Sequence, residues 1–191
     1  ERPEGSREGI LTGMYPSKDA GKAKKGELRV QLLGSGTILR EAIAAAELLD
    51  KDFGVSADIW SCPSFNELRR DGFDNERWNR LHPESEQRVS YVEQCLKGRG
   101  GPAIAATDYV RAFADQIRAF VPMHYTVLGT DGFGRSDTRS NLRRFFEVDR
   151  YYIAHAAVAA LAADGKLSAK DVARAIKMYN IDPEKANPVG V

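Results

Sequence analysis

Four short apolar runs divide the chain at fairly regular intervals. Residues 28–34, 55–61, 103–107 and 125–128 have the apolar content and the flanking turn residues of buried strands. Between these runs, apolar side chains recur every three to four residues, which is the period of an amphipathic helix. This period predicts helices at 37–51, directly after residue 64, at 91–96, at 110–121 and in further segments beyond 137. Because parallel strands need crossover connections, the alternation predicts a three-layer α/β fold with a mostly parallel sheet between helices.

Small polar residues mark the positions where helices are expected to begin. Ser64 can cap the helix that follows the second predicted strand, and either Ser136 or Asp137 can cap the helix after the fourth. Ser168 and Asp171 have the spacing of a capping box, in which each side chain accepts a hydrogen bond from the other residue's backbone N–H. These caps place helix starts independently of the apolar pattern.

Composition and charge narrow the range of partners. Of 191 residues, 42% are hydrophobic and 29% are charged, which is typical of a folded globular protein. The 28 basic and 27 acidic residues leave a net charge of +1, far from the strong positive charge that nonspecific phosphate binding requires. The Ala-rich stretch 151–163 is shorter than the roughly 20 residues of a membrane span. We expect neither nucleic acid nor a membrane as partner, and the lack of a signal-like start favours the cytoplasm.

Residue types that carry catalysis or bind metals show no diagnostic spacing. The two cysteines, Cys62 and Cys95, form no CxxC pair and are predicted to be reduced core residues. His82, His124 and His155 lack the spacing of a metal site, so we predict partly buried imidazoles with satisfied hydrogen bonds. The residues themselves indicate no catalytic, cofactor-binding or metal-binding constellation.

Gly34, Ser35 and Gly36 form a turn between a predicted strand and a predicted helix. Backbone N–H groups at a helix start favour an anion, so this turn is a candidate anion site. The dinucleotide-binding fingerprint requires a third glycine where this sequence has Leu39. A tight turn that simply needs small residues is the alternative interpretation.

The loop 130–137 follows the fourth predicted strand, at the edge of the sheet where open α/β proteins bind ligands. We consider it either a contact or anion-binding loop, or a structural turn in which Phe133 packs inward and Asp and Gly supply turn geometry. The candidate residues of this loop are Asp131, Gly132, Phe133, Gly134, Arg135, Ser136 and Asp137.

Several segments in collinear order resemble the C-terminal region of the thiamine-dependent first component of pyruvate dehydrogenase, in its homodimeric bacterial form. The resemblance runs from about residue 8 to the end of the chain. It rests on GILTGMY (9–15), VQLLGSGTILRE (30–41), SFNELRRDG (64–72), ERWNRLHP (76–83), TDY (107–109), LGTDGFGRSD (128–137), FFEVD (145–149) and NP (187–188).

The resemblance implies a transketolase-type C-terminal domain with a five-stranded, mostly parallel sheet and one antiparallel strand, expected at 10–15. It implies that residues 1–8 are a linker from preceding domains and that 9–191 form a single domain. The Lys-rich stretch 18–25 is expected to be a solvated loop. Cys62 and Pro63 depart from the family's small β-branched residues, so we expect the end of the second strand to bend.

In this family, the full-length enzyme uses thiamine diphosphate and magnesium to decarboxylate pyruvate oxidatively and acetylate a lipoyl group on the second component. The Gly-Asp-Gly triplet and paired asparagines of the thiamine diphosphate motif are absent from this sequence. The resemblance therefore implies a noncatalytic structural domain, inactive in isolation, whose partners are the preceding domains and a second copy of the chain. The alternatives are a small-anion-binding regulatory module and a docking surface for the lipoyl acetyltransferase component, provided by the charged excursion 71–87.

Overall fold

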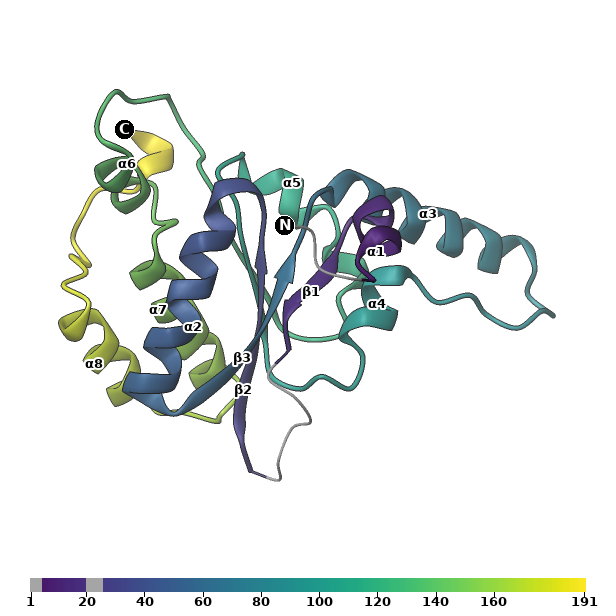
Figure 1. The fold of residues 1–191 in the computed structure, drawn as a ribbon, viewed down its shortest axis with the longest axis horizontal. Helices are drawn as coiled ribbons and strands as arrows, with labels where there is room; N and C mark the ends of the chain where they lie inside the picture. The colour runs from purple at the N-terminus through teal and green to yellow at the C-terminus, as the bar shows by residue number, and fades with distance from the viewer. Residues whose placement is uncertain (1–4, 20–25) are drawn as a thin grey trace.

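A five-stranded sheet forms the centre of the molecule. The computed structural model describes residues 5–19 and 26–191 (Figure 1). The strands are β1 (Tyr15–Lys18), β2 (Leu28–Gly34), β3 (Val55–Ser61), β4 (Ala103–Ala106) and β5 (Tyr125–Leu128). Their order in the sheet is β1-β3-β2-β4-β5; β1 is antiparallel to β3, and the other pairs are parallel. The predicted mostly parallel α/β sheet with one antiparallel strand is confirmed.

Helices cover both faces of this sheet, as the three-layer prediction required (Figure 1). The α-helices are α1 (Arg7–Thr12), α2 (Leu39–Phe53), α3 (Phe65–Leu81), α4 (Tyr91–Leu96), α5 (Arg111–Asp115), α6 (Arg139–Phe145), α7 (Arg150–Ala163) and α8 (Ala169–Met178). Single turns of 3-10 helix occur at Gly36–Ile38, Arg118–Phe120 and Pro188–Gly190. Helices α2, α7 and α8 lie on one face, and α3, α4 and α5 lie on the other.

Successive residues of the strands contribute side chains to two separate hydrophobic cores, one on each face of the sheet. Val30 and Leu32 of β2 belong to the core beneath α2 and α7, whereas Leu33 of the same strand belongs to the core beneath α3 and α4. This division follows from the two-residue period of a strand, which sends successive side chains to opposite faces. Both faces are therefore apolar, as expected for a parallel sheet that is covered on both sides.

The edge strand β1 corrects the prediction of an antiparallel strand at 10–15. Residues 7–12 form helix α1, and the antiparallel strand begins only at Tyr15. Gly9 lies within this helix against the following segment, where an added Cβ would sit 2.6 Å from the carbonyl oxygen of Met14. The close fold-back of a short helix onto its own continuation is a tertiary effect that a six-residue pattern cannot show.

The prediction that residues 71–87 form an excursion from the core is also only partly correct. Ser64 caps α3 as predicted, by accepting a hydrogen bond from the backbone N–H of Glu67, but the helix continues to Leu81. Within this helix, the carboxylate of Asp71 accepts a hydrogen bond from Tyr91 N at 2.6 Å, which ties α3 to the start of α4. The residues after α3 then return to α4 without regular structure.

Other local predictions have mixed outcomes. The capping box of Ser168 and Asp171 is present. Thr138, and neither Ser136 nor Asp137, caps α6. The expected continuous helix at 110–121 is broken into α5 and a 3-10 turn. β3 ends at Ser61, but Cys62 N still donates to Gly34 O at 2.9 Å, so pairing continues past the strand.

Residues 1–4 of the expected linker and 20–25 of the expected solvated loop lie outside the described residues. Within the described ranges, no helix is both long and apolar enough to span a bilayer.

Candidate functional site

The carboxyl ends of β2 and β4 form the topological switch point of the sheet. After β2 the chain enters α2 on one face, and after β4 it enters α5 on the other. At this junction Ser35 Oγ donates a hydrogen bond to Thr107 Oγ1 at 2.8 Å, and Ser35 N donates to Ala106 O at 3.2 Å. Ligands of open α/β sheets bind in the crevice at such a point, because the flanking loops diverge there.

The two glycines of the predicted Gly34-Ser35-Gly36 turn have steric roles. A Cβ on Gly34 would lie 2.7 Å from Leu39 Cα, so only glycine allows the first residue of α2 to pack this closely. Gly36 has a φ of +53°, in the left-handed region that glycine tolerates best. These observations favour the tight-turn interpretation for the backbone of this segment.

The loop 130–137 is tied down at its start. Arg111 donates from its backbone N and from Nε to the carboxylate of Asp131, at 2.9 and 2.5 Å. Partial burial alone would raise the pKa of Asp131, but the hydrogen bonds and charge of Arg111 outweigh it and hold this pKa below its ordinary value. Gly132 has a φ of +96°, and a Cβ there would lie 2.4 Å from Pro188 O. The loop therefore leaves β5 in a fixed direction.

Phe133 does not pack inward, contrary to the structural-turn interpretation. It is 83% exposed at the tip of the loop. Beyond it, the guanidinium carbon of Arg135 lies 5.0 Å from the centre of the Phe145 ring. Asp137 accepts hydrogen bonds from Thr138 N and Asn141 Nδ2, and these bonds lower its pKa.

A cavity of about 590 Å³ is lined by residues of the loop 130–137 but not by Gly34, Ser35 or Gly36. Ser35 and Gly36 line a separate hollow, so the structure does not bring the two predicted turns together in one site. The walls of the 590 Å³ cavity come from the residues after β2, after β4 and after β5, and from α6. Thr37 Oγ1 donates to Asp108 Oδ2 at 3.2 Å, and Thr130 Oγ1 donates to Asp108 O, which links the three strand ends. The lining residues are Thr37, Ile38, Asp108, Thr130, Gly132, Phe133, Gly134, Arg135, Asp137, Arg139, Leu142, Arg143, Phe146 and Val148.

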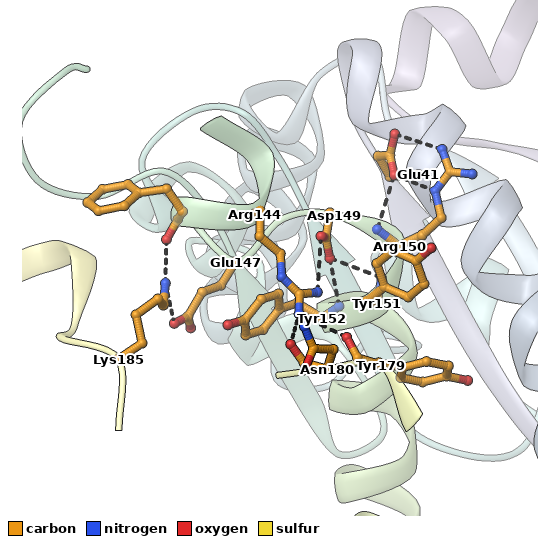
Figure 2. A network of polar contacts seen from close by, with 11 residues as sticks. Glu41, Arg144, Glu147, Asp149, Arg150, Tyr151, Tyr152, Tyr179, Asn180 and Lys185 are labelled. Carbon is orange, nitrogen blue, oxygen red and sulfur yellow. Dashed lines mark hydrogen bonds and ion pairs between the residues drawn. The ribbon is translucent and has the colours of Figure 1, made fainter. Parts of the chain in front are cut away.

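A buried carboxylate behind the cavity positions one of its arginines. Glu41 of α2 accepts from Arg143 Nη1 at 2.8 Å. It also accepts from Arg150 Nε at 2.9 Å and from Arg150 N at 3.1 Å (Figure 2). Burial alone would raise the pKa of Glu41, but the hydrogen bonds from Arg150 and the charges of both arginines lower it. Glu41 thus joins α2 to α6 and α7 as a charged group.

The same region anchors the C-terminal segment (Figure 2). Asp149 caps α7 by accepting from Tyr151 N and Tyr152 N, and it pairs with Arg144 at 3.4 Å. Arg144 also donates to the carbonyl oxygens of Tyr179 and Asn180. Further along, Lys185 Nζ donates to Phe145 O at 2.6 Å and lies 3.0 Å from Glu147. Helix α6, which forms one cavity wall, is therefore held from several directions.

The cysteines and histidines do not line the cavity. Cys62 is buried and Cys95 is partly buried; both are free, and burial raises the pKa of each thiol. His82 and His124 each have a hydrogen-bond partner, as predicted, but both are exposed and not partly buried. His155 corrects the prediction of satisfied imidazoles, because its buried Nε2 has no partner among the described residues.

Within 5–19 and 26–191, no cluster of three His, Cys, Asp or Glu side chains could hold a metal ion. The cavity at the carboxyl edge instead combines arginines with an apolar floor. Sequence reasoning missed Arg139 and Arg143, although their spacing of four residues puts them on one helix face.

Comparison with known proteins identifies the wider family. The profile of the transketolase-like C-terminal domain family matches residues 13–149. Pyruvate dehydrogenase E1 components are similar over the chain: those of Cupriavidus necator (59% identity, all of this chain), Pseudomonas aeruginosa (59%, 98%) and Escherichia coli K12 (52%, 97%). The chain spans about a fifth of the length of these relatives, 21%, 21% and 20% respectively.

Solved structures show the same fold in more distant proteins. Transketolase from Campylobacter jejuni matches with a TM-score of 0.51 and 21% identity, over 76% of this chain and 18% of that one. A transketolase mutant from Pichia stipitis matches with a TM-score of 0.53 and 18% identity, over 84% and 20% of the two chains. The chain therefore belongs to the transketolase-like C-terminal domain family, in the form found in the C-terminal portion of bacterial pyruvate dehydrogenase E1 components.

Proposed function

We propose that this chain is the noncatalytic C-terminal structural domain of a pyruvate dehydrogenase E1 component, cytoplasmic and homodimeric. In that enzyme, pyruvate is oxidatively decarboxylated and a lipoyl group on the second component is acetylated. The preceding domains hold thiamine diphosphate and magnesium. Residues 9–191 form one domain, residues 1–8 lead into it, and the domain packs on its neighbours and supports the dimer.

Exposed aromatic side chains at the carboxyl edge of the sheet are the observation that carries this proposal. Tyr109 is 66% exposed, and its ring contacts that of Phe113 edge to face at a centroid distance of 5.6 Å. Val110 between them is exposed as well. A protein that is complete on its own rarely exposes such a group of large apolar side chains. We therefore expect another protein surface to cover it. The chain is 52–59% identical to about one fifth of longer enzymes, which supports the proposal that neighbouring domains form that surface.

The test uses both the isolated chain and the full-length enzyme that contains it. Isothermal titration of the 191-residue chain with thiamine diphosphate and magnesium is expected to show no binding. Micromolar binding would overturn the noncatalytic assignment. In the full-length enzyme, Tyr109→Ser with Phe113→Ser is expected to weaken the dimer in sedimentation experiments, whereas Met178→Ser on α8 is not. An unchanged dimer in the double variant would refute the packing role of this edge.

Docking of the lipoyl acetyltransferase component is a second candidate, because α3 and the residues after it extend from the body of the molecule (Figure 1). Near the end of this helix, the rings of Trp78 and His82 stack with a centroid distance of 4.4 Å. The guanidinium carbon of Arg88 lies 3.9 Å from the centre of the Trp78 ring. Substitution of Trp78 and the exposed Arg77 in the full-length enzyme is expected to weaken assembly with the second component. Unchanged assembly would eliminate this role.

A further inference from the structure

The cavity at the carboxyl edge occupies the position where a doubly wound sheet binds ligands. Its walls include Thr37 and Ile38, which follow the turn after β2, and Asp108, which lies shortly after β4. These two strands flank the switch point, so the helices that follow them leave toward opposite faces. The hollow therefore follows from the topology of the sheet and does not depend on one surface side chain.

The size and floor of the cavity suit a small organic molecule. A volume of about 590 Å³ lies within the range of ligand pockets in proteins. Ile38 and Val148 are buried beneath it, and Leu142 and Phe146 are partly buried in its wall. An apolar group that entered would cover hydrocarbon surface that water otherwise contacts.

The charged side chains around this floor are unequally satisfied. Asp137 accepts from Thr138 and Asn141, and Asp108 accepts from Thr37, so both carboxylates already have donors from the chain. Arg139, by contrast, has no hydrogen-bond or ion-pair partner in the described parts of the chain. Arg135 contacts only an aromatic ring there. The groups of the cavity that are available to hydrogen-bond a ligand are therefore guanidinium N–H donors.

Arg143 adds a cation that is already held in place. Its side chain is 17% exposed, and Nη1 donates to Glu41, which is itself shared with Arg150. An arginine has five N–H donors, so most of those of Arg143 stay available. Because Arg139 lies one helical turn before Arg143, the two side chains are neighbours on α6. A fixed guanidinium beside an open one is suited to a planar or tetrahedral anion.

We infer that this cavity binds a small organic anion, with a carboxylate or phosphate head on Arg139 and Arg143 and an apolar body on the floor formed by Ile38, Leu142 and Phe146. This inference is independent of the structural role proposed above, because the interface residues Tyr109 and Phe113 do not line the cavity.

Four probes separate the contributions of head and body. The 191-residue chain has its own core on each face of its sheet, so it can be titrated alone. Phenyl phosphate and benzoate carry both parts, inorganic phosphate carries only a head, and benzyl alcohol carries only a body. NMR titration is expected to show saturable binding of phenyl phosphate or benzoate, with shifts at residues 37–38 and 132–146. The tighter of the two identifies the preferred head group. Inorganic phosphate and benzyl alcohol are expected to bind several-fold more weakly.

Matched arginine variants test the placement of the head group. Arg139→Gln is expected to weaken binding of the better probe about tenfold, as for loss of a charge-assisted hydrogen bond. Arg77→Gln, at another exposed helical arginine, is expected to leave it unchanged. Thermal melting checks that both variants are folded. Three results would overturn the inference: equal binding by Arg139→Gln and the wild type, equal binding of inorganic and phenyl phosphate, or no saturable binding up to about 10 mM probe.

Discussion

Replacement of Glu41 by glutamine tests how α6 and α7 are held against α2. The substitution keeps the size of the side chain and removes its charge, so no cavity complicates the result. Two arginines lose their shared carboxylate, and the amide N–H₂ group that replaces one oxygen cannot accept from either. The change therefore isolates the electrostatic part of this contact, of which Figure 2 shows the Arg150 side.

The exposure of the two arginines sets the magnitude. Removal of one partner of a fully buried ion pair costs about 3–5 kcal/mol, because the remaining charge stays desolvated. Arg150 is 44% exposed and can turn to water, whereas Arg143 is 17% exposed and stays largely confined. We therefore expect Glu41→Gln to lower the free energy of unfolding by about 2 kcal/mol. For a chain of this length, the melting temperature is expected to fall by about 4–8 °C.

Urea denaturation followed by circular dichroism measures this loss, with an unchanged m-value showing that only stability has changed. Glu67→Gln is the matched control, because the Glu67–Arg70 pair is largely exposed and is expected to contribute less than about 1 kcal/mol. The pH dependence gives a second check. The folded pKa of Glu41 lies below its ordinary value of 4.5, so its stabilisation is complete above pH 4.5 and is lost as pH falls through the folded pKa. A loss at pH 7 no greater than that of Glu67→Gln would refute the reasoning.

Three further predictions concern the core and the turns. His155 has a pKa below its ordinary value of 6.5, chiefly because burial disfavours its charged form, so stability is expected to fall as pH drops below 6.5. Urea titrations between pH 7 and 5 are expected to show a flatter profile for His155→Leu, and an identical profile would contradict this. Gly101→Ala would place a Cβ 1.7 Å from a carbonyl oxygen of β2, whereas Gly100→Ala, also at positive φ, meets nothing within 4 Å. We expect the first to lower the melting temperature clearly more than the second; equal losses would show that only φ matters. Ellman's reagent is expected to label Cys95 before Cys62 in the native protein, because Cys62 is buried and has the more strongly raised pKa. Simultaneous labelling would show that the core opens as a unit.

The parallel part of the sheet could be predicted from the sequence because each strand is a local apolar run between turn formers. The errors occur where distant contacts decide the outcome. Helix α3 runs past the expected boundary, and there Asp71 accepts from the N–H of Tyr91 and Gly72 lies so close to the ring of Phe120 that a Cβ would be 2.3 Å away. Neither contact has a signature in the sequence around residue 71.

The candidate site, like the fold, could be predicted from the sequence only in part. The turn after β2 and the loop after β5 could be identified singly, from their glycines and from their place after strands. The contacts that Thr37 and Thr130 make with Asp108 could not, because they depend on strand order. Glu41 was missed because a carboxylate on an amphipathic helix normally faces solvent, and only the fold brings Arg143 and Arg150 to it from more than 100 residues away.

The two outer strands of the sheet restrict how this protein can aggregate. β1 and β5 are each four residues long, and β1 contains Pro16 and ends in an exposed lysine. Proline cannot donate a ladder hydrogen bond, and short charged margins are poor templates for a further strand. Fibre-like stacking of one sheet onto another is therefore disfavoured even when the chain is expressed at high concentration. Self-association is then expected to use helix surfaces or strand ends in place of an added strand.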